Sequence, residues 1–364
     1  MYILERRSTP RNFGLKVFLI KVQSIPDSKF EIRDSGIWNL ESGIQYYAGS
    51  ATLKILVTGG AGFIGSHIVD AFLSAGHDVC VVDDLSTGFR HNLASGVPLH
   101  VVDIRDPRLS DVFAAEKPEV VCHQAARANV RESFEKPLLY AEVNVLGSLN
   151  VLECCRGFNI RKMIYASTGG AVYGSPEQLP VTEEHPINPL DPYGASKHHV
   201  EHYMHLYEKN FGVSYTSLRY PNVYGPRQNP FGEAGVVAIF ARQMLDKSRL
   251  VINGSGEQER DFVSVTDIAR ANLLALNKGD GEIMNIGSGL ATSINTIFSS
   301  LADLTGYREK AVYGPAKAGE VYRIYLNADR AKEILGWAPK VGLTEGLGAT
   351  VEYFRESVKS KTDS

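Results

Sequence analysis

The stretch ILVTGGAGFIG, residues 55–65, is an apolar run that ends in closely spaced glycines. A buried strand that turns directly into a helix needs glycine for the tight turn, for the approach of a ligand to the backbone, and for close packing of the helix on the strand. Gly59, Gly62 and Gly65 meet these needs, and the helix that follows would offer free N–H groups to a phosphate. The stretch therefore predicts a dinucleotide-pyrophosphate site, with an ordinary glycine-rich turn as the alternative.

An acid follows at the expected distance along the chain. The apolar run VCVVDD, residues 79–84, ends in acid, and Asp83 lies 18 residues after Gly65. In such folds a carboxylate about 20 residues past the glycines accepts the adenosine 2′-hydroxyl and would repel a 2′-phosphate. The pattern thus predicts NAD rather than NADP as the cofactor.

Apolar runs and helical stretches keep alternating beyond this acid, which is typical of a parallel, doubly wound sheet. We predict an α/β fold with a Rossmann-type sheet and a smaller C-terminal substrate-binding lobe. The NAD-binding domain would span 52–222 and 260–287, the lobe 223–259 and 288–364, and residues 1–51 a loosely ordered N-terminal extension. The expected strands are LKILVT, VCVVDD, PLHVVD, EVVCHQ, KMIYAS, SYTSLRY and EIMNIG.

Charge and composition exclude several other classes of protein. A net charge of −3 with 22% charged residues gives no electrostatic case for binding nucleic acid or an anionic membrane. No uninterrupted apolar run reaches the ~18 residues that a membrane span needs. The four cysteines lack zinc-ligand spacing and are expected to be reduced thiols, as in a cytoplasmic enzyme.

The segment PYGASK, residues 192–197, places a tyrosine four positions before a lysine. Residues four apart share a helix face, so Lys197 would lie beside Tyr193. A cation at ~4 Å in an effective dielectric of ~20 is worth ~4 kcal/mol, which would lower the pKa of the phenol by roughly 3 units. The pair predicts a general base near the redox end of the cofactor, and a solvated surface pair is the alternative.

From residue 54 onward the chain resembles the extended short-chain dehydrogenase/reductase superfamily, and within it the NAD-dependent 4-epimerases of UDP-hexoses. The resemblance covers nearly all of the chain outside residues 1–51. It is carried by TGGAGFIGS, VVDDLSTG, DIRD, HQAARANVRES, NVLGSLNVL, STGGAVYG, PYGASK, LRYPNVYGPRQ and RDFVSVTD.

The resemblance implies an isomerase of galactose metabolism that keeps NAD tightly bound and forms a homodimer. Tyr193 would remove the proton of the sugar 4-hydroxyl while C4 is oxidised, and the transient 4-keto sugar would be reduced on its opposite face. Lys197 would also bind the nicotinamide ribose. A strand-end hydroxyl would bond the reacting oxygen. We favour Thr168 for this role, with Ser167 as the alternative, because glycines that follow leave the alignment uncertain by one residue.

The resemblance also implies cofactor and substrate contacts. Arg127 and Ala128 stand where relatives often have other residues, which puts phosphate contacts there in doubt. The expected cofactor contacts are Gly59, Gly62, Phe63, Ile64, Gly65, Asp83, Asp84, Ser86, Asp103, Ile104, Ala125, Ala126, Asn144, Tyr193 and Lys197. The expected substrate contacts are Thr168, Tyr193, Asn222, Arg260, Lys317 and Glu320, with Ile324 near the sugar.

Other activities of the superfamily remain alternatives. UDP-N-acetylglucosamine or UDP-glucuronate could replace UDP-glucose as substrate, since Ile324 is intermediate in size. A dehydratase would need an acid/base pair directly after the threonine, where this chain has Gly169 and Gly170. A decarboxylase usually has a glutamate there. A non-enzymatic NAD-binding protein would not need the Tyr–Lys pair.

The helix after the Tyr–Lys pair carries His198, His199, His202 and His205. Three of them share a face that points away from the chemistry. A solvated or subunit-facing cluster is favoured over a metal site, because hydride transfer needs no metal and no carboxylate completes a ligand set.

Overall fold

The computed structural model describes residues 37–39, 45–47, 51–231, 235–316 and 321–362. The chain divides into two compact units, residues 1–51 and 52–364. In the first unit, β1 (Ile37–Asn39) and β2 (Gln45–Tyr47) pair antiparallel. Most of the predicted N-terminal extension lies outside the described residues.

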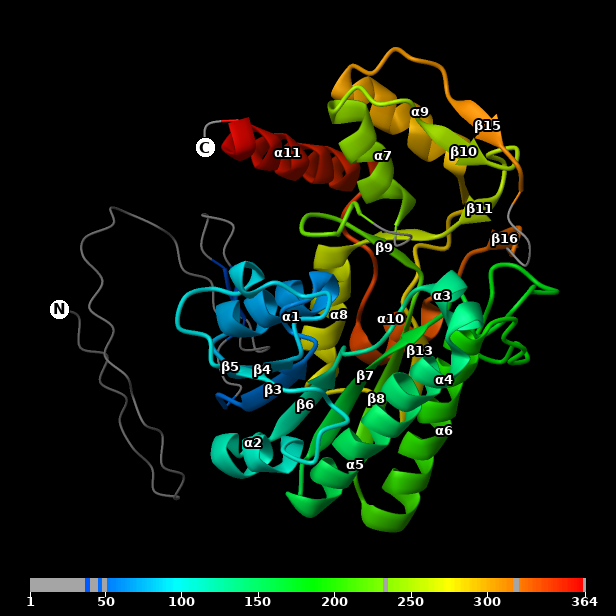
Figure 1. Cartoon of the computed structure of the whole chain (residues 1–364). Helices are drawn as coiled ribbons and strands as arrows, with labels where there is room; N and C mark the ends of the chain where they lie inside the picture. The colour runs from blue at the N-terminus through cyan, green and yellow to red at the C-terminus, as the bar shows by residue number, and fades with distance from the viewer. Residues whose placement is uncertain (1–36, 40–44, 48–50, 232–234, 317–320, 363–364) are drawn as a thin grey trace. The chain divides into compact units, whose positions relative to one another are not determined.

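The second unit is built on a seven-stranded sheet with the order β13-β8-β7-β6-β3-β4-β5 (Figure 1). Every pairing in it is parallel. All seven predicted strands are present, which confirms the α/β fold class. Their bounds are β3 (Lys54–Thr58), β4 (Asp78–Asp83), β5 (Leu99–Val101), β6 (Val120–His123), β7 (Lys162–Thr168), β8 (Ser214–Tyr220) and β13 (Glu282–Asn285).

The strand order reverses at the centre of the sheet. From β3 the chain adds β4 and β5 on one side, and then β6, β7, β8 and β13 on the other. In open α/β sheets a ligand binds at such a switch point, outside the carboxyl ends of the strands. The end of β3, where the glycines follow, lies at this point.

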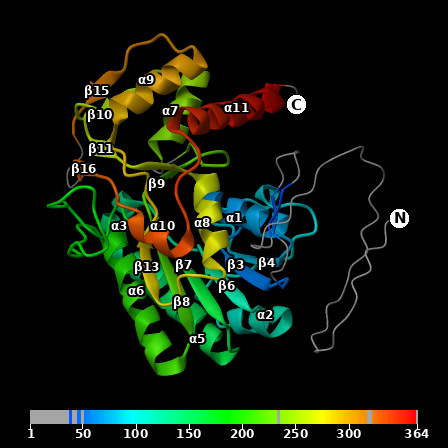
Figure 2. The same cartoon turned by 180° about the vertical axis from the view of Figure 1, so that it is seen from behind.

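Helices cover both faces of the sheet (Figures 1 and 2). Successive strand side chains point to opposite faces, so Ile55 and Val57 belong to one core and Leu56 to the other. The first core also contains residues of α1 (Phe63–Ser74), α8 (Val265–Ala275) and α10 (Asp329–Leu335). The second contains residues of α2 (Leu109–Glu116), α5 (Gly147–Gly157) and α6 (Pro192–Phe211). The four cysteines are buried and free.

A third core lies among α7 (Val236–Leu245), α9 (Ile294–Thr305) and α11 (Leu343–Thr362), and includes Val237, Ile297 and Val351. Short strand pairs adjoin these helices: β9 (Asn222–Tyr224) with β12 (Phe262–Ser264), and β10 (Val251–Asn253) with β15 (Val312–Gly314). A three-stranded sheet has the order β14 (Thr292–Ser293), β11 (Glu259–Arg260), β16 (Arg323–Ile324). The predicted boundaries of the two domains stay a prediction.

The remaining helical turns connect β4 to β5 and β6 to β7. They are η1 (Arg90–Asn92), α3 (Val130–Glu135), α4 (Pro137–Tyr140) and the π-helix η2 (Ala141–Leu146). Within the described residues, Pro137–Gly157 is one helical segment whose length and hydropathy would match a membrane span. Its inner side, which includes Val151 and Leu152, packs in the core.

Candidate active site

The glycine turn has the steric demands that its sequence predicts. Gly59 has a φ of +67°, and a Cβ there would lie 2.6 Å from the Ala125 nitrogen. A Cβ on Gly65 would lie 2.1 Å from the Gly59 carbonyl oxygen. Gly62 is the N-cap of α1 and has no side chain with which to cap the helix. The first turn of α1, at Phe63 and Ile64, therefore suits a phosphate, and the turn fits a dinucleotide such as NAD.

Asp83, the last residue of β4, is hydrogen-bonded to the glycine turn. Its carboxylate accepts hydrogen bonds from the backbone N–H of Ala61 at 2.9 Å and of Leu85 at 2.8 Å. Burial raises the pKa of Asp83, and the two N–H groups partly offset that rise. Asp84, which is exposed, accepts a bond from the Ser86 N–H at 2.9 Å. The acid thus stands at the glycine turn, and its contact with a ribose stays a prediction.

Asp103 and Ile104 follow β5, as the sequence predicts. The Asp103 carboxylate pairs with the Arg105 guanidinium at 2.6 Å, and this hydrogen-bonded pair lowers its pKa. Ile104 is buried, and a Cβ on Gly147 would lie 2.7 Å from its Cδ1. The two residues therefore offer one polar and one apolar contact at this edge.

Asn144 lies in the π-helix, and its side-chain amide is hydrogen-bonded to other residues of the protein. Its Oδ1 accepts from the Arg127 N–H at 2.8 Å, and its Nδ2 donates to the Arg127 carbonyl at 3.0 Å and to Ser196 Oγ at 2.9 Å. Ser196 Oγ donates in turn to the Tyr193 carbonyl at 2.7 Å. Asn144 thus fixes the loop that follows Ala125 and Ala126 against the start of α6.

The same bonds continue toward β3 through a buried histidine. His123 Nδ1 lies 2.6 Å from Thr58 Oγ1, and its Nε2 lies 2.8 Å from Ser148 Oγ. Ser148 Oγ donates to the Asn144 carbonyl at 2.5 Å. Burial lowers the pKa of His123 to about 3, so this imidazole is neutral. We call the whole series the β3–α6 chain: Thr58, His123, Ser148, Asn144, Ser196 and the Tyr193 carbonyl.

Tyr193 stands at the start of α6, where Asp191 caps the helix by accepting from the Gly194 N–H at 2.7 Å. The phenol is hydrogen-bonded to Thr168, at the end of β7. Burial raises the pKa of Tyr193 to about 12, and the bond with Thr168 offsets only part of that rise. The predicted lowering of this pKa by Lys197 is therefore wrong for this structure, because desolvation raises the pKa and the charge of Asp191 raises it further.

Lys197 is buried one turn further along α6. Its Nζ donates to the Ala166 carbonyl at 2.8 Å and lies 4.8 Å from the centre of the Tyr165 ring. Burial lowers the pKa of Lys197 to about 7, while the charge of Glu201 raises it. The Lys197 side chain thus reaches the carboxyl-terminal part of β7, and burial opposes its charge.

The two hydroxyls at the end of β7 have different neighbours. Thr168 bonds Tyr193, whereas Ser167 lies toward Glu201 and helps to lower the pKa of that carboxyl. The geometry therefore favours Thr168 over Ser167 as the hydroxyl of the catalytic group.

Two of the expected substrate contacts, Thr168 and Asn222, lie on either side of Gly170. A Cβ built on Gly170 would lie 3.8 Å from Thr168 Oγ1 and 4.0 Å from Asn222 Oδ1, so there is room between them. Arg260, on β11, donates to the carbonyls of Glu259 at 2.9 Å and Tyr322 at 3.2 Å. Lys317 and Glu320 lie outside the described residues. Ile324 is buried.

Sequence reasoning missed Asp261 as a structural residue. Its buried carboxylate accepts from Ser288 N at 2.9 Å and Leu326 N at 3.1 Å. It thereby ties the strand of Arg260 to the loop after β13 and to the end of β16. The adjacent Arg–Asp pair in RDFV was the available signal. The buried pair Glu201 and Arg219 was missed too, although Glu201 follows Lys197 by four residues.

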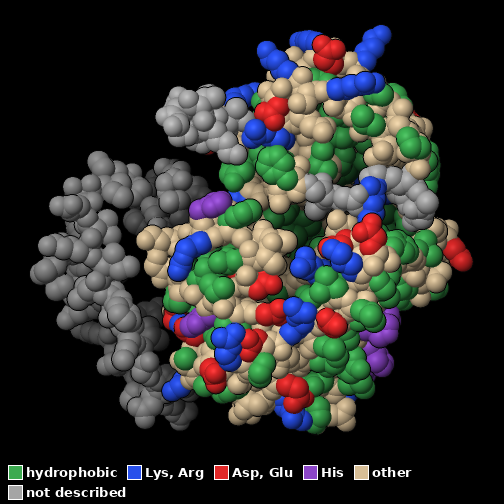
Figure 3. Space-filling model, in the orientation of Figure 1, with side chains coloured by type: hydrophobic (Ala, Val, Ile, Leu, Met, Phe, Trp, Pro, Cys, Tyr) green, Lys and Arg blue, Asp and Glu red, His purple; other side chains and the backbone are tan. Residues whose placement is uncertain are grey.

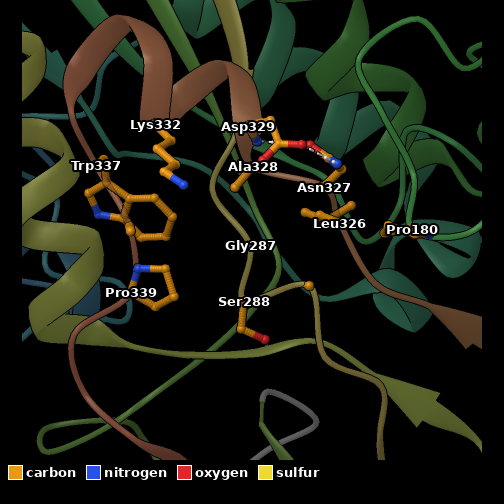
Figure 4. A pocket seen from close by; sticks show the side chains of 12 residues that line it. Pro180, Gly287, Ser288, Leu326, Asn327, Ala328, Asp329, Lys332, Trp337 and Pro339 are labelled. Atoms are coloured by element: carbon orange, nitrogen blue, oxygen red, sulfur yellow. Dashed lines mark hydrogen bonds between the residues drawn. The ribbon is translucent and has the colours of Figure 1, made fainter.

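A cleft of about 200 Å³ opens beside this loop (Figure 4). Figure 4 shows that its walls come from the loop after β13 and from both ends of α10. Neither Tyr193 nor the glycine turn contributes to it. Its lining is Pro180, Gly287, Ser288, Gly289, Leu326, Asn327, Ala328, Asp329, Lys332, Trp337, Ala338 and Pro339.

A parallel sheet with a glycine turn at its switch point, and a Tyr-x-x-x-Lys pair beside the end of β7, defines an extended short-chain dehydrogenase/reductase. The model of the NAD dependent epimerase/dehydratase family matches residues 55–287. A protein of Methanocaldococcus jannaschii is 49% identical over 303 residues, which cover 83% of this chain and 99% of the relative. The chain belongs to the NAD-dependent epimerase/dehydratase family.

The solved structures that are similar to this chain include two UDP-glucose 4-epimerases. The UDP-glucose 4-epimerase of Thermotoga maritima, solved with UDP-glucose, is 46% identical with a TM-score of 0.83, over 84% of this chain and 100% of that chain. The UDP-glucose 4-epimerase of Thermus thermophilus, in complex with NAD, is 44% identical with a TM-score of 0.80, over 83% of this chain and 99% of that chain.

Proposed function

We propose that this protein is a UDP-hexose 4-epimerase that interconverts UDP-glucose and UDP-galactose with tightly bound NAD. The observation that carries the proposal is the group formed by Thr168, Tyr193 and Lys197 at the end of β7, one strand beyond the switch point. The two similar epimerases, solved with UDP-glucose and with NAD, support this substrate and this cofactor.

The residues divide the work at the sugar 4-hydroxyl. NAD, when bound, supplies the acceptor that takes hydride from C4 and returns it. Tyr193 moves the hydroxyl proton, and Thr168 bonds the same oxygen so that it stays aligned. Burial raises the pKa of Tyr193 to about 12, so nearby positive charge is needed to lower this pKa and favour the phenolate. Lys197 would supply part of that charge.

A dehydratase or decarboxylase is disfavoured by the space around the strand end. A Cβ on Gly169 would lie 2.3 Å from Leu326 Cδ1, so a side chain with proton-transfer capacity there would require Leu326 to move. Gly170 has room but no side chain. The site therefore supports oxidation and reduction at C4 without a second acid/base pair.

An activity assay tests the proposal. Purified protein should be incubated, without added NAD, with UDP-galactose, its N-acetyl form or UDP-galacturonate, and the products separated. We expect UDP-glucose to form from UDP-galactose. Preference for either of the other sugars would assign the 4-epimerase of UDP-N-acetylglucosamine or UDP-glucuronate instead. Net release of NADH with no stereochemical change would refute an epimerase, and binding of NAD without any turnover would leave only a cofactor-binding protein.

We also propose a cytoplasmic homodimer formed through the helices around α6. Leu138 on α4, Leu146 on η2 and Leu206 on α6 are 77%, 58% and 39% exposed, and these elements pack against one another. The histidines of α6 border this face, and Figure 3 shows a histidine patch at the edge where α6 lies. A second copy would cover these apolar side chains.

Sedimentation tests the dimer. We expect the wild type to sediment as a dimer and Leu206→Asp to shift it toward monomer. The matched control is Leu290→Asp, since Leu290 is 67% exposed on the segment before α9. A monomeric wild type would contradict the proposal.

A further inference from the structure

Glu201, one helical turn after Lys197 on α6, forms a buried ion pair with Arg219. The Glu201 carboxylate accepts from Arg219 Nε at 2.9 Å and from Arg219 Nη2 at 2.7 Å, in the two-pronged geometry that makes such pairs strong. The two side chains are 1% and 4% exposed. Ser217 Oγ also donates to Glu201, at 3.1 Å.

Hydrogen bonds that involve strands β8 and β13 hold the pair in place. Arg219, on β8, donates through Nη1 to the Tyr173 hydroxyl at 2.8 Å, and that hydroxyl donates to Asn285 Oδ1, on β13, at 2.7 Å. Glu201 is thereby held at one position on α6. Burial opposes ionisation of Glu201, but its contacts with His198, at 3.4 Å, and with Arg219 outweigh burial and hold its pKa at about 2.

Glu201 lies one helical turn beyond Lys197, on the same face of α6. The titratable groups around Lys197 are Tyr193 and Glu201 on its own helix, Tyr165 on β7 and His123 on β6, with the Arg219 guanidinium of β8 on the far side of Glu201. Tyr193, Tyr165 and His123 are neutral near pH 7, because burial raises the pKa of both phenols and lowers that of the imidazole. Glu201 is the negative charge of this set.

We propose that Glu201, fixed by Arg219, is a positioning residue that keeps Lys197 in its ammonium form beside Tyr193. The inference rests on the proposed epimerase activity. The buried Glu201–Arg219 pair would then contribute to catalysis as well as to the stability of the fold. A buried ion pair is often no more stabilising than apolar side chains of the same size. In the absence of Glu201, an ammonium at this depth would lose its proton, and Tyr193 would lose the nearby positive charge.

The pH profile of turnover tests the inference. Lys197 must be protonated to act, so turnover falls as pH rises through its pKa. Glu201→Gln removes the negative charge, and we expect the alkaline limb of kcat to move to lower pH by about one unit or more. Glu208→Gln is the matched control, because it removes the same charge from α6 two turns further on, where Glu208 pairs with Lys209. Its profile should match the wild type.

A second variant separates this role from stability. Glu201→Gln leaves Arg219 buried without its partner and will weaken the fold. Glu201→Leu combined with Arg219→Met removes both charges, and we expect it to regain stability in urea while keeping the shifted alkaline limb. A double variant that regains both stability and the wild-type profile would overturn the inference. Wild-type protein that does not epimerise any UDP-sugar would instead refute the proposed function.

Discussion

At the scale of single residues, the site combines two side chains whose charged forms are opposed by burial. Burial raises the pKa of Tyr193 to about 12 and lowers that of Lys197 to about 7. Burial therefore disfavours both the phenolate of Tyr193 and the ammonium of Lys197 near neutral pH. Their chemistry depends on neighbours that offset desolvation, namely Thr168 for the phenol and Glu201 for the ammonium.

Removing the phenol hydroxyl should stop turnover without releasing the cofactor. Tyr193→Phe keeps the ring that packs at the start of α6 but has no proton to exchange. We expect kcat to fall by roughly 10²–10⁴-fold, the usual value of a general acid–base. Bound NAD, measured after denaturation, should stay at the wild-type amount. A variant that retains most of its turnover would exclude Tyr193 as the base.

The two hydroxyls of β7 should differ in effect. Thr168→Ala removes the partner of Tyr193, and we expect a fall of about 10-fold or more in kcat with little change in KM. Ser167→Ala changes the neighbour of Glu201 instead and should leave kcat within about 3-fold of the wild type. Equal kinetic losses in the two variants would contradict the assignment.

At the scale of elements, the β3–α6 chain couples the strand before the glycine turn to the helix that carries Tyr193. Its hydrogen bonds cross from β3 through β6 and the π-helix to α6. π-helical turns inside longer helices are frequent at functional sites. Here the π-helix places Asn144 between the loop at Arg127 and the first turn of α6.

Breaking this chain should damage catalysis more than stability accounts for. Asn144→Ala removes three hydrogen bonds, and we expect a loss of about 1–3 kcal/mol in the free energy of unfolding. Because α6 would shift relative to β7, kcat should fall by roughly 10- to 100-fold. Asn272→Ala on α8 is the control: it loses buried bonds to Tyr220 and Ile268 and should lower stability only. Similar kinetic losses in both variants would argue against the coupling.

At the scale of the whole molecule, the sequence predicted what depends on local pattern. The seven strands follow from apolar runs and the turn from the spacing of its glycines. The pKa of Tyr193 was predicted wrongly because the sequence shows that Lys197 is four residues away but not how deeply packing buries both. Other contacts join segments that are far apart in the chain. Asn144 is hydrogen-bonded to Arg127 and Ser196, and Asp261 accepts hydrogen bonds from Ser288 and Leu326. No periodicity or spacing records those contacts.

Acid should unfold the molecule in a range set by its buried histidine. The pKa of His123 is about 3 in the folded protein and near 6.5 when unfolded, so the unfolded chain binds the extra proton between these values. This group should therefore lower the free energy of unfolding by about 1.4 kcal/mol for each pH unit below 6.5. Urea titrations of the wild type and of His123→Gln between pH 4 and 7 would measure it. An unchanged pH slope in the variant would refute this origin.

The contact between Gly169 and Leu326 has a consequence for redesign. A Cβ on Gly169 would meet Leu326 Cδ1 at 2.3 Å, so a carboxylate at position 169 requires Leu326 to move or to be replaced by a smaller residue. Conversion of this scaffold to a lyase therefore has to consider positions 169 and 326 together.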